Sequence, residues 1–344
     1  MTTLTNYPMN WQCAHGGPAG NGTLRARPEY FVVDEILGCE PDCEGEHDML
    51  RIEKTGTNTE WLARQLARHA GIAARDVGFS GMKDRHAVTT QWFSVRRPSG
   101  SGTDWDAFDA PGCRLIEQSR NLRKLRRGAH SANNFKIIIS DLQAKPDVLN
   151  DRLERALASG VPNYFGEQRF GHGGRNIDLA LSLFAGKRLA RDKRSIAISA
   201  ARSWLFNQAL SARVVAGTWD QPLLPGPLML DGTNSYFEGE QGDESLASRL
   251  QQLDVHPALP LPGGDEANDG GEAGEPDYAV ALRTGLATHA KQGMRAARLA
   301  VRNLDWSIGD DRLEMSFQLV AGGFATAVIR ELVTTTQASV SSNT

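Results

Sequence analysis

Residues 78–95, Gly-Phe-Ser-Gly-Met-Lys-Asp-Arg-His-Ala-Val-Thr-Thr-Gln-Trp-Phe-Ser-Val, place glycines, cations and aromatic rings around one carboxylate, Asp84. Lys83 and Arg85 flank this acid, and nearby positive charge favours the ionised form of a carboxyl group. Gly78 and Gly81 allow close approach of the backbone. An ionised carboxylate can act as a nucleophile, but it is a poor general acid at neutral pH. An isolated triplet of this kind is more often a solvated surface turn, so other motifs must decide between the two interpretations.

The same stretch resembles the motif of the TruD family of tRNA pseudouridine synthases, in which the pattern Gly-x-Lys-Asp-Arg-x-Ala-x-Thr-x-Gln contains a nucleophilic aspartate. The matching residues here are Gly81, Lys83, Asp84, Arg85, Ala87, Thr89 and Gln91. Further blocks match in the same order along the chain, at residues 27–35, 45–47, 160–171, 193–195, 199–203 and 322–332. The resemblance therefore runs from about residue 22 to residue 335.

The resemblance implies an α+β fold of two domains. The catalytic domain, residues 1–159 plus 299–344, would have the pseudouridine-synthase fold, a mixed, largely antiparallel sheet with flanking helices. A second, α/β domain of the TruD type would be inserted at residues 160–298. The pattern agrees, because strand and helix periodicities at both ends of the chain enclose a region of basic loops and helices. A chain of 344 residues is also long enough for two hydrophobic cores.

Periodicity and turn residues predict the main elements. A helix is expected at 57–71, because Thr57 and Glu60 have capping-box spacing and Gly71 can end it. Other helices are expected at 147–159, 177–189, 199–216, 279–298 and 325–333, and strands at 77–82, at 134–140 and within 298–320. The acidic, glycine-rich segment 263–276 is predicted to be a flexible surface loop, and the tail from Thr334 to be disordered.

Composition excludes several classes of protein. Hydrophobic residues make up 40% and charged residues 23%, as in soluble globular proteins. No apolar run approaches the roughly 18 residues of a membrane span, and no secretory signal is recognisable, so we expect a cytoplasmic protein with no membrane contact. The four cysteines and eight histidines lack the spacing of metal ligands, so no metal is expected.

The charge is unevenly distributed. The net charge is −3, but residues 231–277 hold twelve acids and one base, so the rest of the chain carries +8. Residues 114–136 contain seven bases and one acid, and residues 160–202 contain eight bases and three acids. Local basic patches of this kind attract phosphate groups, although either patch alone is equally compatible with a solvated face.

The resemblance also assigns roles to single residues. It implies that Asp84 is catalytic, that Phe31 and Phe324 offer aromatic surfaces to the base, and that Asn133 contacts the substrate. An amide can donate and accept together, which suits a uracil edge. No cofactor is implied. Arg25, Lys83 and Arg85 are all candidates for the cation that pairs with Asp84; Arg25 is favoured because residues next to Asp84 in sequence can point away from it.

The function that follows is conversion of uridine to pseudouridine in tRNA, with uridine 13 as the expected target. The partner is tRNA; we expect a monomer with no obligate protein partner. Whether the aspartate attacks C1′ or assists proton loss at C2′ stays open. One alternative is an RNA-binding module without activity, and another is a glycoside- or nucleoside-cleaving hydrolase, which would normally need a second carboxylate. The chain departs from the family pattern at Tyr30, where an aspartate is usual, in the long acidic segment, and in the loosely matching region 215–298.

Overall fold

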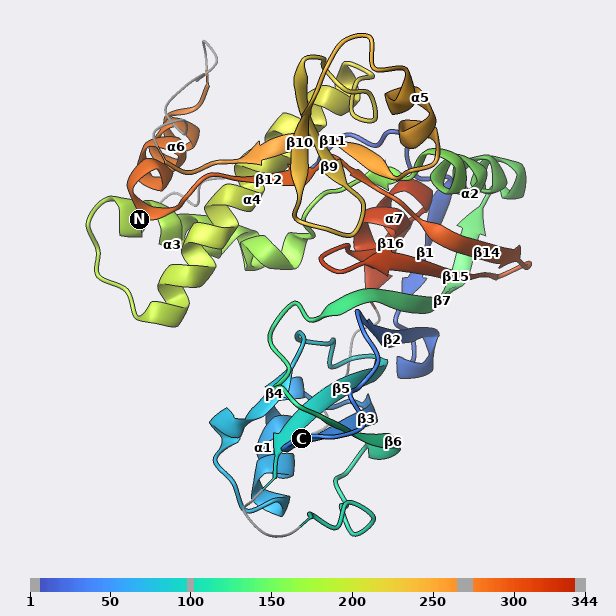
Figure 1. Cartoon of the computed structure of the whole chain (residues 1–344). Coiled ribbons are helices and arrows are strands. Elements are labelled where there is room, and N and C mark those ends of the chain that lie inside the picture. Colours follow the sequence, from blue (N-terminus) through green and yellow to red (C-terminus); the bar gives the residue numbers. More distant parts are fainter. Residues whose placement is uncertain (1–6, 98–101, 265–274, 338–344) are drawn as a thin grey trace. The chain divides into compact units, whose positions relative to one another are not determined.

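The computed structural model describes residues 7–97, 102–264 and 275–337, which form two compact units (Figure 1). Unit 1 comprises the N-terminal residues through Pro18, Asn150–Ala300 and Gly323–Leu332. Unit 2 comprises Ala19–Leu149, Val301–Gly322 and the residues from Val333 onward. These units group residues by contact and need not coincide with an inserted domain and its host. The predicted division into 1–159 plus 299–344 and 160–298 therefore stays a prediction.

Unit 2 is built on a mixed sheet. Among the described residues it has ten strands: β1 Gly20–Leu24, β2 Phe31–Leu37, β3 His47–Thr55, β4 Val77–Phe79, β5 Val88–Arg96, β6 Cys113–Asn121, β7 His130–Ala144, β14 Arg302–Ile308, β15 Arg312–Val320 and β16 Thr334–Gln337. Seven of them follow the order β14-β15-β7-β2-β5-β3-β6, while β1 pairs with β7 and β16, and β4 pairs with β5. The pairs β2–β5 and β1–β16 are parallel and the others antiparallel, as predicted for a largely antiparallel sheet.

Strand β7 is the longest strand of this sheet. Phe135, Ile137 and Ile139 are buried on one face, which confirms the alternation expected at 134–140. The strand runs well beyond those bounds, because it pairs with β15 along one edge and with both β1 and β2 along the other. Strand β15 follows the turn at residues 309–311 and buries every second residue, as its sequence predicts.

Helix α1, Thr59–His69, covers part of the sheet in unit 2. Leu62 and Leu66 pack with Leu50, Ile52 and Phe93 of the strands in one core cluster. The predicted capping box was wrong. Asn58 is the N-cap, and its side chain accepts hydrogen bonds from the backbone N–H groups of the second and third helical residues. The hydroxyl of Thr57 donates instead to the carbonyl of Thr55 at the end of β3.

Unit 1 combines helices with two small sheets (Figure 1). Its helices are α2 Pro146–Ser159, which begins in unit 2, α3 Arg175–Phe184, α4 Arg191–Val215, α5 Glu244–Gln251, α6 Asp277–His289 and α7 Ala325–Leu332. Its strands are β8 Val161–Pro162, β9 Gly226–Leu230, β10 Tyr236–Gly239, β11 Val255–Leu261, β12 Gly293–Ala296 and β13 Arg298–Leu299. Helix α4 packs on β11, and the helices α3, α4 and α6 contact one another around one hydrophobic core.

Several expected bounds were wrong. Helix α4 begins at Arg191, eight residues before the expected start, and the helix expected at 279–298 ends at His289 because residues 293–296 join the small sheet as β12. The tail prediction was wrong at its start, since Thr334–Gln337 form β16 and pair in parallel with β1. Most of the predicted surface loop, residues 265–274, and the end of the tail lie outside the described residues.

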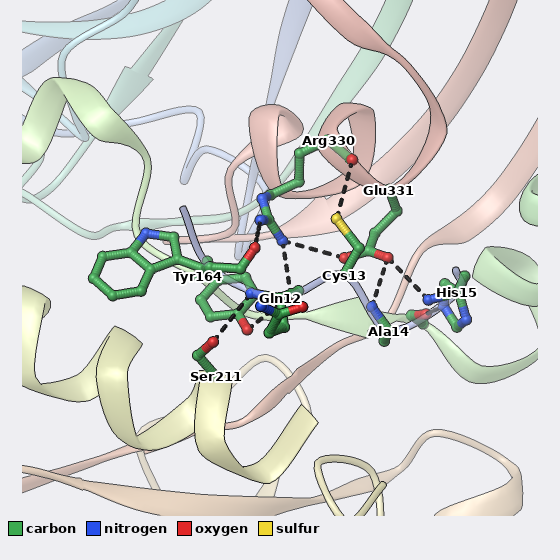
Figure 2. Close-up of polar contacts among 10 residues, drawn as sticks. Gln12, Cys13, Ala14, His15, Tyr164, Ser211, Arg330 and Glu331 are labelled. Carbon is green, nitrogen blue, oxygen red and sulfur yellow. Dashed lines mark hydrogen bonds and ion pairs between the residues drawn. The ribbon is translucent and has the colours of Figure 1, made fainter. Parts of the chain in front are cut away.

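The N-terminal segment is fixed to unit 1 by the last turn of α7 (Figure 2). The buried carboxylate of Glu331 accepts hydrogen bonds from the backbone N–H groups of Ala14, at 2.9 Å, and His15, at 3.1 Å. The guanidinium of Arg330 lies 4.7 Å from the Tyr164 ring and donates to the carbonyl of Gln12. A buried carboxylate is costly unless it is hydrogen-bonded. These contacts explain why a segment at the start of the chain belongs to the same unit as α7.

Candidate active site

Asp84 lies in the segment that joins β4 to β5, residues 80–87, which we call the Asp84 loop. Its side chain is 26% exposed, and Oδ2 lies 2.6 Å from a guanidinium nitrogen of Arg25. The other oxygen, Oδ1, accepts a hydrogen bond from the backbone N–H of His86 at 3.0 Å. The preference for Arg25 as the paired cation is therefore confirmed. Arg85 points elsewhere, since its Nε donates to the carbonyl of Gly56 at 3.2 Å.

Arg25 is held rigidly behind the carboxylate. Its guanidinium carbon lies 4.1 Å from the centroid of the Phe31 ring, and its side chain is 11% exposed. Burial lowers the pKa of Arg25, and the charge of Asp84 partly offsets this effect. The residue has φ of 58°, a left-handed backbone that costs about 1–2 kcal/mol for a residue with a side chain. Strain of this kind persists where the surroundings fix a functional geometry.

The backbone of the Asp84 loop is fixed by buried polar side chains. The hydroxyl of Thr59 accepts from the N–H of Lys83 at 3.1 Å and donates to Gln91 Oε1 at 2.9 Å. Gln91 in turn donates to the carbonyl of Gly81 at 3.2 Å. The motif glutamine therefore supports the loop that carries the acid.

Lys54, on β3, binds the carbonyl of Asp84 itself. Its ammonium donates to that oxygen at 3.2 Å and to the carbonyl of Thr57 at 2.8 Å. The side chain is almost completely buried, and burial lowers the pKa of Lys54 to about 8. Two backbone acceptors are therefore satisfied by an ammonium group whose pKa lies only slightly above neutral pH.

Lys83 does not face Asp84. Its Nζ lies 2.8 Å from Glu35 Oε2 and 2.5 Å from Asn133 Oδ1. The other oxygen of Glu35 accepts from Ser80 Oγ at 2.8 Å and from the backbone N–H of Trp92 at 3.1 Å. The cation next to the acid in sequence thus belongs to a separate buried cluster.

The structure brings three of the four predicted site residues into unit 2. Asp84 and Phe31 are linked through Arg25, and Asn133 is linked to the Asp84 loop through Lys83. Phe31 is 3% exposed; its ring forms a T-shaped pair with Phe135 and carries the Arg25 guanidinium over its face. The register of β7 places Asn133 opposite Glu35 of β2 on the buried face, whereas the neighbouring Asn134 is exposed.

Phe324, the fourth predicted residue, lies in unit 1 just before α7. It is half-buried, with its ring centroid 6.1 Å from that of Phe165. The guanidinium carbon of Arg295 lies 4.1 Å from the Phe165 centroid and 5.9 Å from that of Phe324. Burial and, to a smaller extent, the nearby charge of Arg169 lower the pKa of Arg295 to about 9. Aromatic rings and cations thus form a local cluster in this unit.

Sequence reasoning gave no role to Glu35, Lys54 or Thr59. The sequence did indicate that Glu35 is buried, because it follows Phe31 and Val33 at period two on β2, and those two residues are buried. Lys54 continues the buried positions of β3 in the same way. A charged residue in the apolar phase of a strand is a strong sign of a buried polar network, since such residues are rarely buried without partners.

The described part of the chain contains no group of three metal-ligating side chains close enough to hold an ion. Within the same residues, no helix has the length and apolar character needed to cross a bilayer.

Comparison with known proteins assigns the chain to a family. The model of the family described as tRNA pseudouridine synthase D (TruD) matches residues 9–179 and 182–332. The chain belongs to the TruD family. It is 45% identical to tRNA pseudouridine synthase D of Methylococcus capsulatus over 329 residues, which cover 93% of each chain. It is 43% identical to that of Nitrosococcus oceani over 339 residues, which cover 94% of each. The resemblance drawn from the motifs is confirmed.

A solved structure of a candidate TruD protein from Methanosarcina mazei has the same fold. The two structures superpose with a TM-score of 0.68 at 18% sequence identity, and the superposition covers 95% of this chain and 96% of the other. The predicted α+β fold, with a mixed sheet, flanking helices and a two-domain arrangement, is therefore the TruD fold and is confirmed.

The buried position of Lys54 generates a pH-dependent prediction. Its folded pKa of about 8 lies below the ordinary value of 10.5, so between these pH values the unfolded chain binds the extra proton and stability rises with pH. Below pH 8 both states are protonated and this contribution is constant. At about 1.4 kcal/mol per pKa unit, the gain is roughly 3 kcal/mol. Lys54→Met removes it, so the stability of this variant relative to the wild type should fall by about that amount from pH 7.5 to 10.5 in urea unfolding.

The matched control is Lys136→Met, which replaces an exposed lysine on β7 of the same unit. Its stability relative to the wild type should stay constant over this pH range. Parallel pH profiles for Lys54→Met and the wild type would contradict the assignment.

Proposed function

We propose that this chain converts uridine to pseudouridine in tRNA, with Asp84 as the nucleophile and uridine 13 as the target. The observation that carries the proposal is the partly exposed Asp84 carboxylate, which lies 2.6 Å from a buried arginine in a loop fixed by buried polar groups. Membership of the TruD family supports uridine isomerisation in tRNA. The position of the target uridine and the role of the aspartate are the finer parts of the proposal.

The chemistry requires one bond to break and another to form at the same ribose carbon. The N1–C1′ bond breaks, the base turns and C5 bonds to C1′, while the proton at C5 is lost to solvent and N1 takes up a proton from solvent. An ionised carboxylate serves either route, since it can attack C1′ or accept the proton that leaves C2′. Arg25 stabilises the negative charge and orients the carboxylate. No electrons are transferred, so the proposed reaction needs neither a redox cofactor nor a nucleotide.

The target nucleotide must leave its stack before Asp84 can reach the ribose, which costs roughly a few kcal/mol. Stacking of a base on an aromatic ring returns about 1–3 kcal/mol. We assign the stacking role to Phe324, which is half-buried. Phe31 is assigned to it as well, but indirectly, because the Arg25 guanidinium covers the face of its ring. Asn133 is assigned to the polar edge of the uracil. The protein is proposed to act as a cytoplasmic monomer on tRNA, with residues 160–298 as the inserted domain.

A basic loop lies beside the Asp84 loop in unit 2 and is suited to the RNA backbone. Between β6 and β7 the chain carries four exposed cations without an acid, Arg123, Lys124, Arg126 and Arg127. The N–H of Gly128 donates to the carbonyl of Ser80 at 2.7 Å, and the N–H of Leu125 donates to Ser94 Oγ at 2.8 Å. These contacts fix the basic loop against the start of the Asp84 loop. Phosphates flanking the extruded nucleotide are the ligands that we assign to it.

Asp84→Asn should lower turnover of unmodified tRNA by at least about 10³-fold, because the amide can neither attack carbon nor accept a proton. Release of tritium from 5-labelled uridine in tRNA measures the rate, and mapping of the modified site tests the assignment to uridine 13. The matched control, Asp109→Asn, changes an exposed acid of unit 2. A hydrolase would instead free uracil, and an inactive binding module would release no label. Full activity of Asp84→Asn would refute the role of the aspartate.

Arg25→Ala should lower turnover by about 10²-fold or more while the affinity for tRNA changes little, because the ion pair acts on the reacting carboxylate. Arg25→Lys should recover part of the rate, since it restores the charge but not the planar contact with Phe31. Single-turnover rates at saturating enzyme separate the two effects. A variant with normal turnover and weak binding would place Arg25 in tRNA affinity alone.

Replacing Arg123 and Arg126 together by serine should weaken tRNA binding at physiological salt and lower the salt dependence of log Kd by about two, one per lost phosphate contact. Turnover at saturating tRNA should stay close to that of the wild type. Arg312→Ser, at an exposed arginine on the β14–β15 hairpin of the same unit, is the control. An unchanged salt slope would exclude the basic loop from the RNA interface.

A further inference from the structure

The cluster of Glu35, Lys83 and Asn133 is buried and geometrically fixed. The Glu35 side chain is completely buried and the Lys83 side chain is 8% exposed. Lys83 lies within 2.8 Å of both of its partners, and the far oxygen of Glu35 has two donors of its own from Ser80 and Trp92. Burying a charged pair is costly and seldom increases stability over an apolar pair of similar size. Its presence beside the Asp84 loop therefore calls for a role other than stability.

The cluster determines which way the Asn133 amide points. An ammonium group can only donate hydrogen bonds, so the atom of Asn133 that lies 2.5 Å from Lys83 Nζ must be the carbonyl oxygen. The NH₂ group consequently points away from Lys83, and it makes no hydrogen bond to any side chain or backbone group of the described residues. Without this cation, the two ends of an amide are nearly equal in shape and either could face a ligand.

The location of Asn133 matches that of a base. It lies opposite Glu35 on the neighbouring strand, on the same buried face as Phe31. Phe31 and Glu35 are four residues apart on β2, which corresponds to about 13 Å along the strand. Arg25 and Asp84 lie at the Phe31 end of this face, and Asn133 lies at the other. The proposed function places the base of a nucleoside whose ribose is at Asp84 on the Asn133 side of this face.

We infer that Glu35 and Lys83 are positioning residues that lock the Asn133 amide, so that only its NH₂ donor faces the base and selects a carbonyl oxygen. This inference rests on the proposed function, since it needs uracil beside Asn133. Uracil presents carbonyl oxygens at both C2 and C4. We place the locked donor at O4 of the uracil before the turn. Cytosine has an amino group at that position, which would meet the locked amide donor to donor and leave both groups without an acceptor.

A fixed orientation of the Asn133 amide is also compatible with rotation of the base during the reaction. For C5 to replace N1 beside C1′, the ring turns about the axis through N3 and C6, and this turn also exchanges O2 and O4. A fixed donor at one of these positions therefore meets a carbonyl oxygen before and after the turn. A uracil can keep the hydrogen bond in both states, whereas a cytosine would lose it in one of them. An amide free to flip would not discriminate in this way.

The test measures the preference for uracil over cytosine. The probes are two tRNA transcripts that differ only in uridine or cytidine at the target position, and binding of each is measured to the wild type and to Lys83→Met. The ratio of the two affinities should fall about tenfold or more in Lys83→Met, because the freed amide can turn its oxygen toward the cytosine amino group. Turnover of the uridine transcript should fall as well.

A second comparison separates positioning from general damage to the fold. In an Asn133→Ala background the amide is absent, so Lys83→Met should cause no further loss of the preference. The neutral pair Glu35→Gln with Lys83→Met avoids an uncompensated buried charge and should show the same loss as Lys83→Met alone. Thermal unfolding checks that each variant is folded.

An unchanged preference in both Lys83 variants, or an equal loss in the Asn133→Ala background, would overturn the inference. The proposed function fails by a different result, namely absence of tritium release by the wild type. The affinity ratio is measured without turnover, so the two failures are distinguishable.

Discussion

The ion pair between Arg25 and Asp84 is the interaction around which unit 2 arranges its polar groups. The proposed function needs a carboxylate that is charged, partly accessible and fixed in position, although accessibility and fixation normally oppose each other. The chain resolves this by burying the cation rather than the acid. Arg25 lies between the Phe31 ring and Asp84, in a left-handed backbone conformation, while the carboxylate stays about one quarter exposed. Stabilisation of charge and access for a ligand are thus supplied by different residues.

The Asp84 loop has no regular secondary structure, so side chains replace the hydrogen bonds that a sheet would give. Lys54, Thr59 and Gln91 each bind a backbone group of the loop, and each comes from a helix or strand of unit 2. Rigid elements position a site more accurately than loops do. The Lys-Asp-Arg triplet therefore serves three separate purposes. Its acid faces Arg25, its lysine enters a buried cluster, and its arginine holds a neighbouring turn.

Sequence reasoning reached the parts of this arrangement that depend on local pattern. Alternation identified the buried faces of β7 and β15, and Arg25 was correctly favoured as the partner of Asp84 because residues next to the acid in sequence can point away from it. It could not find the partners of Glu35, because periodicity shows that a residue faces the core but not which distant side chain meets it there. It also missed β16, whose partner β1 lies about three hundred residues earlier in the chain. The cap of α1 was misplaced by one residue, because Thr57 and Asn58 are both residue types that cap helices and the sequence does not distinguish them.

The contacts of Glu331 have a consequence for synthesis of the protein. His15 and Glu331 are 316 residues apart, yet the first supplies a backbone donor to the buried carboxylate of the second. While the ribosome is still translating, the N-terminal segment has no α7 on which to settle. Unit 1 can be completed only when nearly the whole polypeptide has emerged from the exit tunnel. The N–H groups of Ala14 and His15 therefore have no Glu331 acceptor for most of the elongation time, and a truncated product that lacks α7 would never acquire it.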